Sequence, residues 1–191
     1  AGMAIIESND IQHGPLELFI TADEETGMYG AFGLEPGTLQ GKLLMNMDSE
    51  DFGELYVGCA GGMDATIEWK YQGVALPVGD IALKVNITGL KGGHSGLEIN
   101  LGRANANKLL FRFLKEAVSQ YEARLAKVEG GNMRNAIPRE AYAIITVPAE
   151  AREDIEKLVE EYRDLFNEEY KVTENPIVFT CEEVEAPEML I

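Results

Sequence analysis

The stretch Ile81-Ala82-Leu83-Lys84-Val85-Asn86-Ile87-Thr88 alternates apolar and polar side chains. Leu83, Val85 and Ile87 fall on one face of an extended chain, as in an antiparallel strand with one buried and one solvated face. Residues 66–71 alternate in the same way, residues 141–147 predict a further strand that stops at Pro148, and residues 176–180 predict the last strand. We therefore expect a largely antiparallel sheet in this part of the chain.

Two helices are predicted between these strands from apolar residues spaced by threes and fours. The first is predicted to be long and to end at Gly130-Gly131, because glycine is common just past a helix C-terminus. Its apolar positions are Ala106, Leu110, Phe113, Ala117, Tyr121, Leu125 and Val128, and those of the second helix are Ile155, Leu158, Val159, Tyr162, Leu165 and Phe166. This order of strands and helices predicts a two-layer α+β sandwich, followed by an acidic tail from Glu182.

The first 62 residues have a different pattern. Apolar runs at residues 3–6, 15–22, 42–47 and 55–60 are separated by Gly-rich or acidic turns. Short continuous apolar runs are typical of buried strands, so they predict a piece of an α/β sheet. Short helices are expected before His13 and between Gly27 and Gly37. The character of the sequence changes after Gly61-Gly62, which places the boundary near residues 62–75.

Acidic residues stand where two of these runs end. The run Leu16-Glu17-Leu18-Phe19-Ile20-Thr21-Ala22 leads into Asp23-Glu24-Glu25, and residues 42–47 lead into Asp48-Ser49-Glu50-Asp51. Adjacent carboxylates repel one another unless a cation holds them, and sites in open α/β sheets gather at the carboxyl ends of strands. The pattern is typical of a divalent-metal site, but solvated loop acids would look the same.

Composition limits the classes of function. The chain has 191 residues, 46% of them hydrophobic, and a net charge of −17. Such acidity argues against nucleic acid or an anionic membrane as partner. Neither a signal peptide nor a membrane-spanning run is recognisable at the sequence level. Two widely spaced cysteines predict no disulfide framework, so the cytoplasm is the expected compartment. Cys59, in an apolar run, is expected to be a small core residue.

Six motifs in fixed order resemble the middle of an aminoacylhistidine dipeptidase, an Xaa-His or carnosine-type enzyme of the di-zinc clan that also holds aminoacylases and glutamate carboxypeptidases. They are ThrAlaAspGluGluThrGlyMetTyrGlyAlaPheGlyLeu (21–34), MetAspSerGlu (47–50), TyrValGlyCysAlaGlyGly (56–62), GlyLeuLysGlyGlyHisSerGly (89–96), AlaAsnLysLeuLeuPheArgPheLeu (106–114) and GlyGlyAsnMetArgAsnAlaIleProArgGlu (130–140).

The resemblance implies a domain organisation. Residues 1–63 would be part of a zinc-peptidase catalytic domain built on a mixed α/β sheet. Residues 64–191 would be a two-layer, ferredoxin-like α+β lid and dimerisation domain, incomplete at its C-terminus. Because such enzymes are much longer, the chain is expected to be an internal fragment, inactive alone, of a protein that forms homodimers through the lid.

The resemblance also implies roles for the acids. Glu24 matches the general base, which takes a proton from metal-bound water and returns it to the leaving amine. Glu25 and Asp48 match zinc ligands of a site that holds two Zn²⁺ ions. Zinc needs three or four protein ligands, so the remaining ones would lie outside this chain. His13 matches no ligand motif and is interpreted as a loop residue.

Three residues of the lid domain are implied to act on the substrate. His94 matches a lid histidine that donates a hydrogen bond to the substrate carbonyl oxygen, usually in the partner subunit's active site. From the residues alone it could equally be a loop histidine in a Gly-rich turn. Asn135 matches a substrate-contacting asparagine. Arg134 could pair with a substrate carboxylate or be a surface charge.

The function implied is hydrolysis of Xaa-His dipeptides by a zinc-dependent dipeptidase. The alternatives are a related metallo-aminopeptidase or N-acyl-amino-acid deacylase, or, for the chain by itself, only a lid and dimerisation module.

Overall fold

The computed structural model describes residues 1–49, 51–59 and 61–191. The chain divides into two compact units, Ala1–Ala65 and Thr66–Ile191, which are described separately. The roles predicted for residues 1–63 and 64–191 stay predictions.

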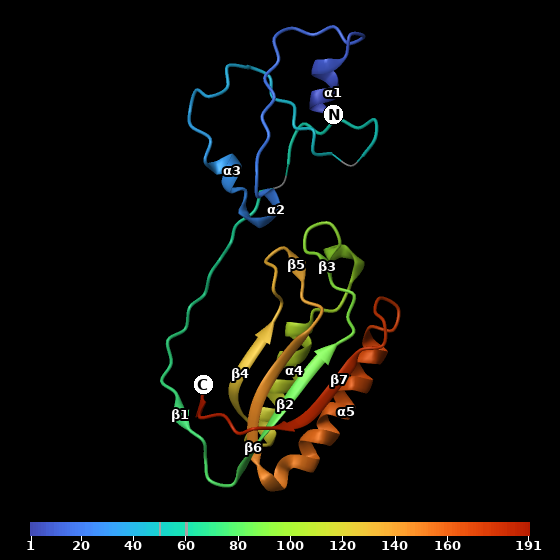
Figure 1. Ribbon diagram of the computed structural model, residues 1–191. Helices are drawn as coiled ribbons and strands as arrows, with labels where there is room; N and C mark the ends of the chain where they lie inside the picture. Colours follow the sequence, from blue (N-terminus) through green and yellow to red (C-terminus); the bar gives the residue numbers. More distant parts are fainter. Residues whose placement is uncertain (50, 60) are drawn as a thin grey trace. The chain divides into compact units, whose positions relative to one another are not determined.

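The second unit is built on a four-stranded antiparallel sheet (Figure 1). Its strands are β2 (Asp80–Thr88), β4 (Arg124–Gly130), β6 (Ala141–Pro148) and β7 (Val178–Val184), in the spatial order β4-β6-β2-β7. With one helix after β2 and another after β6, the chain order is βαββαβ, which is the ferredoxin-like arrangement. The two-layer, ferredoxin-like α+β fold expected for this part of the chain is therefore confirmed.

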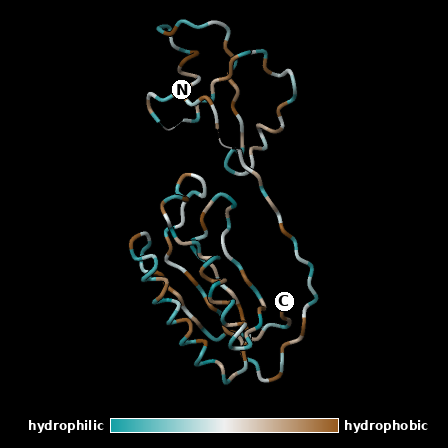
Figure 2. Tube along the Cα trace, turned by 180° about the vertical axis from the view of Figure 1, so that it is seen from behind, coloured by the Kyte–Doolittle hydropathy of each residue, from teal (hydrophilic) through white to brown (hydrophobic). Residues whose placement is uncertain are grey.

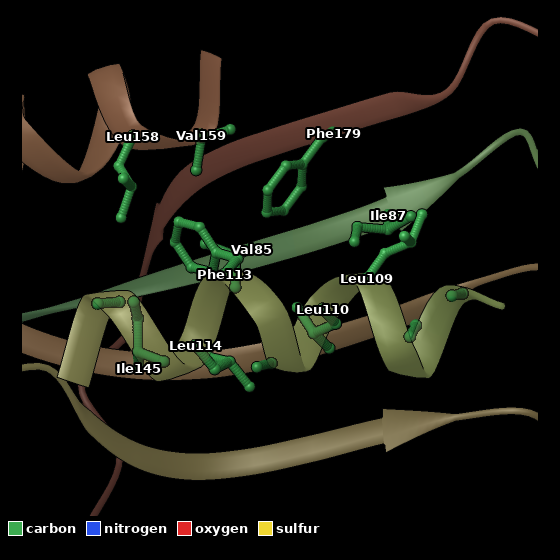
Figure 3. Close-up of a cluster of buried hydrophobic side chains, with 14 of the residues drawn as sticks. Val85, Ile87, Leu109, Leu110, Phe113, Leu114, Ile145, Leu158, Val159 and Phe179 are labelled. Atoms are coloured by element: carbon green, nitrogen blue, oxygen red, sulfur yellow. The ribbon is translucent and has the colours of Figure 1, made fainter. Parts of the chain in front are cut away.

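Two helices, α4 (Ala106–Gln120) and α5 (Arg152–Glu169), cover one face of this sheet. The alternation in β2 explains why: Leu83, Val85 and Ile87 are fully buried, whereas Lys84 between them is partly exposed. Figure 3 shows Val85 and Ile87 facing Leu109 and Phe113 of α4. Polar residues interrupt the apolar ones along both helices (Figure 2), as an amphipathic helix on a sheet requires.

The remaining elements of this unit are short. β1 (Val74–Ala75) pairs with β8 (Met189–Leu190), and β3 (Gly93–His94) pairs with β5 (Ala136–Ile137), both antiparallel. Two single 3₁₀ turns, η1 (Ile99–Leu101) and η2 (Ala149–Ala151), lie before α4 and α5. In Figure 1 the β3–β5 ladder lies beyond one end of the main sheet, and the Ala106 N–H at the start of α4 donates to the carbonyl of Pro138, just after β5.

The first helix is shorter than the apolar spacing predicts. α4 ends at Gln120, and Arg124 begins β4, where the sequence predicts helix as far as Gly130. Glu122 adopts a left-handed conformation with φ of 55°, which an α-helix cannot continue through, and the Ala123 N–H donates to the Ala117 carbonyl instead.

Two strand predictions also need correction. Residues 66–71 form no strand, although their side chains alternate. β7 continues to Val184, so the acidic segment from Glu182 begins inside the sheet and not as a free tail. Glu182 lies opposite Lys84 of β2 and is 3.9 Å from its Nζ, so the strand pairing gives this acid a cationic neighbour.

The first unit contains three short helices, α1 (Gly2–Glu7), α2 (Glu24–Gly27) and α3 (Tyr29–Phe32). None of its four predicted strands forms among the residues described between 1 and 65, and Cys59 is exposed. Residues 3–6 are helical, with the Ile5 N–H donating to the Ala1 carbonyl. Elsewhere a backbone N–H group donates a hydrogen bond to a side chain and not to a neighbouring strand: the Gln40 N–H donates to the Glu17 carboxylate at 2.8 Å. The helix expected between Gly27 and Gly37 is present as α3.

Candidate functional site

The acidic cluster at residues 23–25 lies at the N-terminus of α2. Asp23 has a φ of 60°, and Glu24 and Glu25 form the first turn of α2. Carboxylates are favourable in the first turn of a helix because its N–H groups lack partners. Both glutamates are exposed.

Asp48 lies in an exposed segment without regular structure, and its N–H donates to Asn46 Oδ1 at 3.0 Å. Its neighbour Glu50, and Ala60 of the motif at 56–62, fall outside the described residues. Within residues 1–49, 51–59 and 61–191, no three His, Cys, Asp or Glu side chains come together as a metal site would need. Glu25 and Asp48 alone are too few to hold a zinc ion, so the described residues do not fit the metal by themselves.

His94 and Asn135 are brought together by the β3–β5 ladder. His94 lies opposite Ala136, Gly93 lies opposite Ile137, and the Ser95 N–H donates to the Asn135 carbonyl at 2.9 Å. Forty residues of chain separate the two, so their closeness follows from the pairing of β3 with β5 and could not be read from either motif alone.

The ring of His94 has a defined hydrogen-bonding role. Its Nδ1 atom lies 3.0 Å from the Gly96 nitrogen and 3.1 Å from the Leu97 nitrogen, and both backbone N–H groups donate to it. A ring nitrogen that accepts carries no proton, so in neutral His94 the proton lies on Nε2. The side chain is exposed, which leaves the Nε2–H group as a donor available to a ligand.

An open groove of about 890 Å³ lies along this ladder. Its lining includes His94, Asn135, Lys91, Arg139 and Tyr142. Glu129 and Glu140 also line the groove, and the Tyr142 hydroxyl donates to Glu129, so the lining carries both signs of charge and suits a small polar ligand. Arg134, placed on the substrate by resemblance, is exposed and is not among the lining residues.

Three residues near His94 were not anticipated from the sequence. Glu98 Oε2 accepts a hydrogen bond from the His94 N–H at 2.7 Å, and Arg103 lies 2.8 Å from Glu98 Oε1. The His94 hydrogen bond is the largest cause of a lowered pKa for Glu98, to which Arg103 also contributes, while partial burial acts in the opposite direction. The buried Glu174 accepts from the Lys91 and Ala104 N–H groups.

The sequence carries a weak signal for Glu98 and none for Glu174. Glu98 follows His94 by four residues, a spacing at which a side chain can return to the backbone at the start of a turn. Glu174 lies 70 residues after Ala104 along the chain, so only the fold joins them. No helix in the described part of the chain has the length and apolar character needed to cross a bilayer.

This chain is similar to a peptidase domain family and to two dipeptidases. The family model of the peptidase dimerisation domain matches residues 85–174. Cytosol non-specific dipeptidase of Escherichia coli (strain K12) is 43% identical over 184 residues, which are 96% of this chain and 38% of that protein. The crystal structure of aminoacylhistidine dipeptidase from Vibrio alginolyticus matches with a TM-score of 0.72 and 44% identity, over 99% of this chain and 39% of that one.

The chain thus spans about two fifths of the length of these relatives. The similarity runs through both units, and the family match lies inside the ferredoxin-like unit. This chain is therefore similar to two dipeptidases along almost all of its length, and residues 85–174 match the family model of the peptidase dimerisation domain.

Proposed function

We propose that the longer protein containing this chain is a metal-dependent dipeptidase that hydrolyses Xaa-His dipeptides. The observation that carries the proposal is identity of 43–44% to two dipeptidases across almost the whole chain. The Xaa-His preference rests on the name of the Vibrio relative, since the Escherichia coli relative is named non-specific. A metallo-aminopeptidase or an N-acyl-amino-acid deacylase is the alternative within the same enzyme class.

The proposed division of labour follows the two units. Residues 1–63 contribute part of the catalytic domain, with Glu24 as general base and Glu25 and Asp48 as ligands of two Zn²⁺ ions. The other ligands come from parts of the protein outside this chain. A general base must take a proton from the attacking water and return it to the leaving amine. The first turn of α2 supports this role, because it places Glu24 and Glu25 next to each other in one helical turn.

Residues 64–191 act as the lid through which a homodimer forms. His94 donates a hydrogen bond from Nε2 to the carbonyl oxygen of the scissile peptide as negative charge develops there. The tautomer supports this role, since both N–H donors at Nδ1 leave the proton on Nε2. Asn135 contacts the substrate from the same groove. Arg134, which does not line the groove, is a second candidate for the substrate carboxylate. We also propose a cytoplasmic location, in keeping with the name of the Escherichia coli relative.

Substitutions at two acids in the longer protein test the assignment. Glu24→Gln keeps shape and should leave zinc content unchanged while lowering turnover by roughly 10²–10⁴-fold, the usual contribution of a general base. Asp48→Ala should instead deplete zinc, because removal of a ligand weakens coordination directly. Elemental analysis and hydrolysis of carnosine separate the two effects.

The exposed Glu35 offers a matched control, and Glu35→Gln should change neither zinc content nor turnover. Zinc loss in Glu24→Gln would reverse the roles of Glu24 and Glu25. Unchanged zinc in Asp48→Ala would identify Asp48 as a solvated loop acid, with a stability change within about 0.5 kcal/mol. The 191-residue chain by itself should be inactive, and zinc-dependent hydrolysis by it would contradict our account of the missing ligands.

A further inference from the structure

The loop that carries His94 is held from two sides by carboxylates. It runs from Lys91 to Ala104, between β2 and α4. Glu174, in the turn after α5, accepts from the Lys91 N–H at 2.8 Å and from the Ala104 N–H at 2.9 Å. Because one buried side chain bonds both ends, it fixes the distance between them. Lys91 adds a second link, since its Nζ donates to the Thr173 carbonyl at 2.6 Å.

Inside the loop, Glu98 holds the backbone of His94 directly. Its Oε2 accepts the His94 N–H, and the Glu98 N–H donates back to the His94 carbonyl at 3.0 Å. Both backbone polar groups of His94 are therefore bonded to one residue. The backbone of His94 is thus held at both its N–H and its C=O, and only the imidazole remains to be oriented.

Arg103 connects Glu98 to the backbone of Gly92, which directly precedes β3. Its guanidinium pairs with Glu98 Oε1 at 2.8 Å and donates to the Gly92 carbonyl at 2.6 Å. The packing is close: a Cβ at Gly93, where φ is 146°, would lie 2.5 Å from Arg103 and 2.8 Å from Glu98. The positive φ favours glycine there, and a larger residue would also push aside the ends of the Arg103 and Glu98 side chains. The ion pair therefore lies against the backbone of the ladder that joins His94 to Asn135.

The imidazole depends on the same turn. Its Nδ1 accepts from Gly96 and Leu97, which lie between His94 and Glu98 in the chain. If the turn opened, these N–H groups would move away from Nδ1, and the ring would lose both the fixed orientation and the bias toward the Nε2–H tautomer.

We propose that Glu98, buttressed by Arg103, is a positioning residue that holds His94 in one orientation and one tautomer, with Glu174 fixing the base of the same loop. The inference deepens the proposed function, on which its catalytic consequence rests. The orientation of His94 by Glu98, Arg103 and Glu174 involves only described residues of the second unit.

Nuclear magnetic resonance of the whole 191-residue chain tests the structural content. Glu98→Ala should speed hydrogen exchange of the His94 amide by roughly 10-fold or more, because a hydrogen bond to a charged acceptor is lost. The His94 ring signals should shift from the Nε2–H tautomer toward a mixture. His13, the other histidine, is the internal reference, and Glu185→Ala, at an exposed acid, is the matched control.

The inference is overturned if the His94 signals of Glu98→Ala coincide with those of the wild type and of Glu185→Ala. Amide signals of β2 and β6 report whether the sheet is intact. If Glu98→Ala disturbs them, Glu98→Gln decides, because it keeps the volume and an acceptor but loses the charge that pairs with Arg103. It should change His94 in the same direction by a smaller factor, and no change would overturn the inference.

Kinetics of the longer protein test the catalytic consequence. Glu98→Ala should lower kcat by roughly 10-fold or more with KM nearly unchanged, since misplacement of a catalytic group costs rate. The same substitution in a His94→Ala background should cost nothing further, because residues that act through one another are not additive. An equal loss in both backgrounds would refute positioning through His94. Absence of any dipeptidase activity would instead refute the proposed function and leave the spectroscopic result standing.

Discussion

The two cysteines have opposite surroundings, and their chemistry should differ accordingly. Cys59 is exposed, whereas burial, the largest cause, raises the pKa of Cys181 to about 11, with a smaller contribution from Glu156. Relative to a thiol at the ordinary value of 9.0, the reactive thiolate of Cys181 is scarcer by about 100-fold near neutral pH. Iodoacetamide should therefore modify Cys59 first, with peptide mass mapping over time as the measurement. A Cys59→Ser variant isolates the slow reaction, and equal rates at both sites would contradict the burial of Cys181.

Protonation of Glu98 should release the turn around His94. The lowered pKa means that the carboxylate form stabilises the fold. This contribution is complete above the ordinary value of 4.5, declines below it, and is lost once pH falls through the lowered pKa. The His94 amide shift, followed from pH 7 downward, should titrate with a midpoint below 4.5. Glu98→Gln should remove that titration, and a midpoint at or above 4.5 would contradict the hydrogen bond.

At the residue scale, the sequence carries a signal where a motif is local and none where the partners are distant in the chain. The Gly-rich motif around His94 was recognisable, and the structure pairs that segment with the one carrying Asn135. Glu174 could not be found, because its two N–H partners lie in another loop and its own neighbours form no motif. The roles of all six predicted site residues stay predictions: Glu24, Glu25, Asp48, His94, Arg134 and Asn135.

At the level of elements, the period of apolar residues predicts which side chains of a helix or strand are buried. It does not predict at which residue the element ends. β2, β6 and α5 lie where the spacing predicts them. The predicted helix is too long because Leu125 and Val128 continue the spacing of α4 by coincidence. Periodicity does not reveal that Glu122 adopts the left-handed conformation that ends the helix. In residues 1–65 the apolar runs resemble strands, yet a strand also needs a neighbour for its N–H and C=O groups, which a run of residues does not reveal.

Phe113 of α4 should dominate the packing between helices and sheet. It is fully buried, and its ring centroid lies 5.1 Å from Phe179 of β7 and 5.9 Å from Tyr162 of α5, both edge-to-face. Phe113→Ala should lower the free energy of unfolding by about 3–5 kcal/mol in urea titrations, since it leaves a cavity. Phe111→Ala, at a side chain 53% exposed on the same helix, should cost less than about 1 kcal/mol. Similar losses in both variants would contradict the orientation of α4.

For the whole molecule, the proposed homodimer predicts that two inactive variants restore activity when they are mixed. If His94 serves the partner subunit's site, mixing Glu24→Gln subunits with His94→Ala subunits should restore about a quarter of wild-type activity under two-fold pairing. Half of the randomly formed dimers are mixed, and each mixed dimer has one site with both groups intact. Hydrolysis of carnosine after subunit exchange measures the recovery.

Each variant alone serves as the control, and His94→Ala alone should lower turnover by roughly 10²–10³-fold. Proof that subunits exchange, for example by differently tagged chains, is needed beside the assay. Exchange without recovery would mean that His94 serves its own subunit or takes no part in the reaction.

The strand order β4-β6-β2-β7 has a consequence for the timing of synthesis. β2 is made first among the main strands, but both strands beside it, β6 and β7, come later in the chain. β6 follows about 50 residues later, which at 5–20 residues per second takes on the order of 3–10 s on the ribosome. During this interval both edges of β2 are unpaired and its face of Leu83, Val85 and Ile87 has only α4, and then β4, to shelter it. A nascent chain of this fold is therefore most exposed to chaperones, and to other chains, between the emergence of β2 and that of β6.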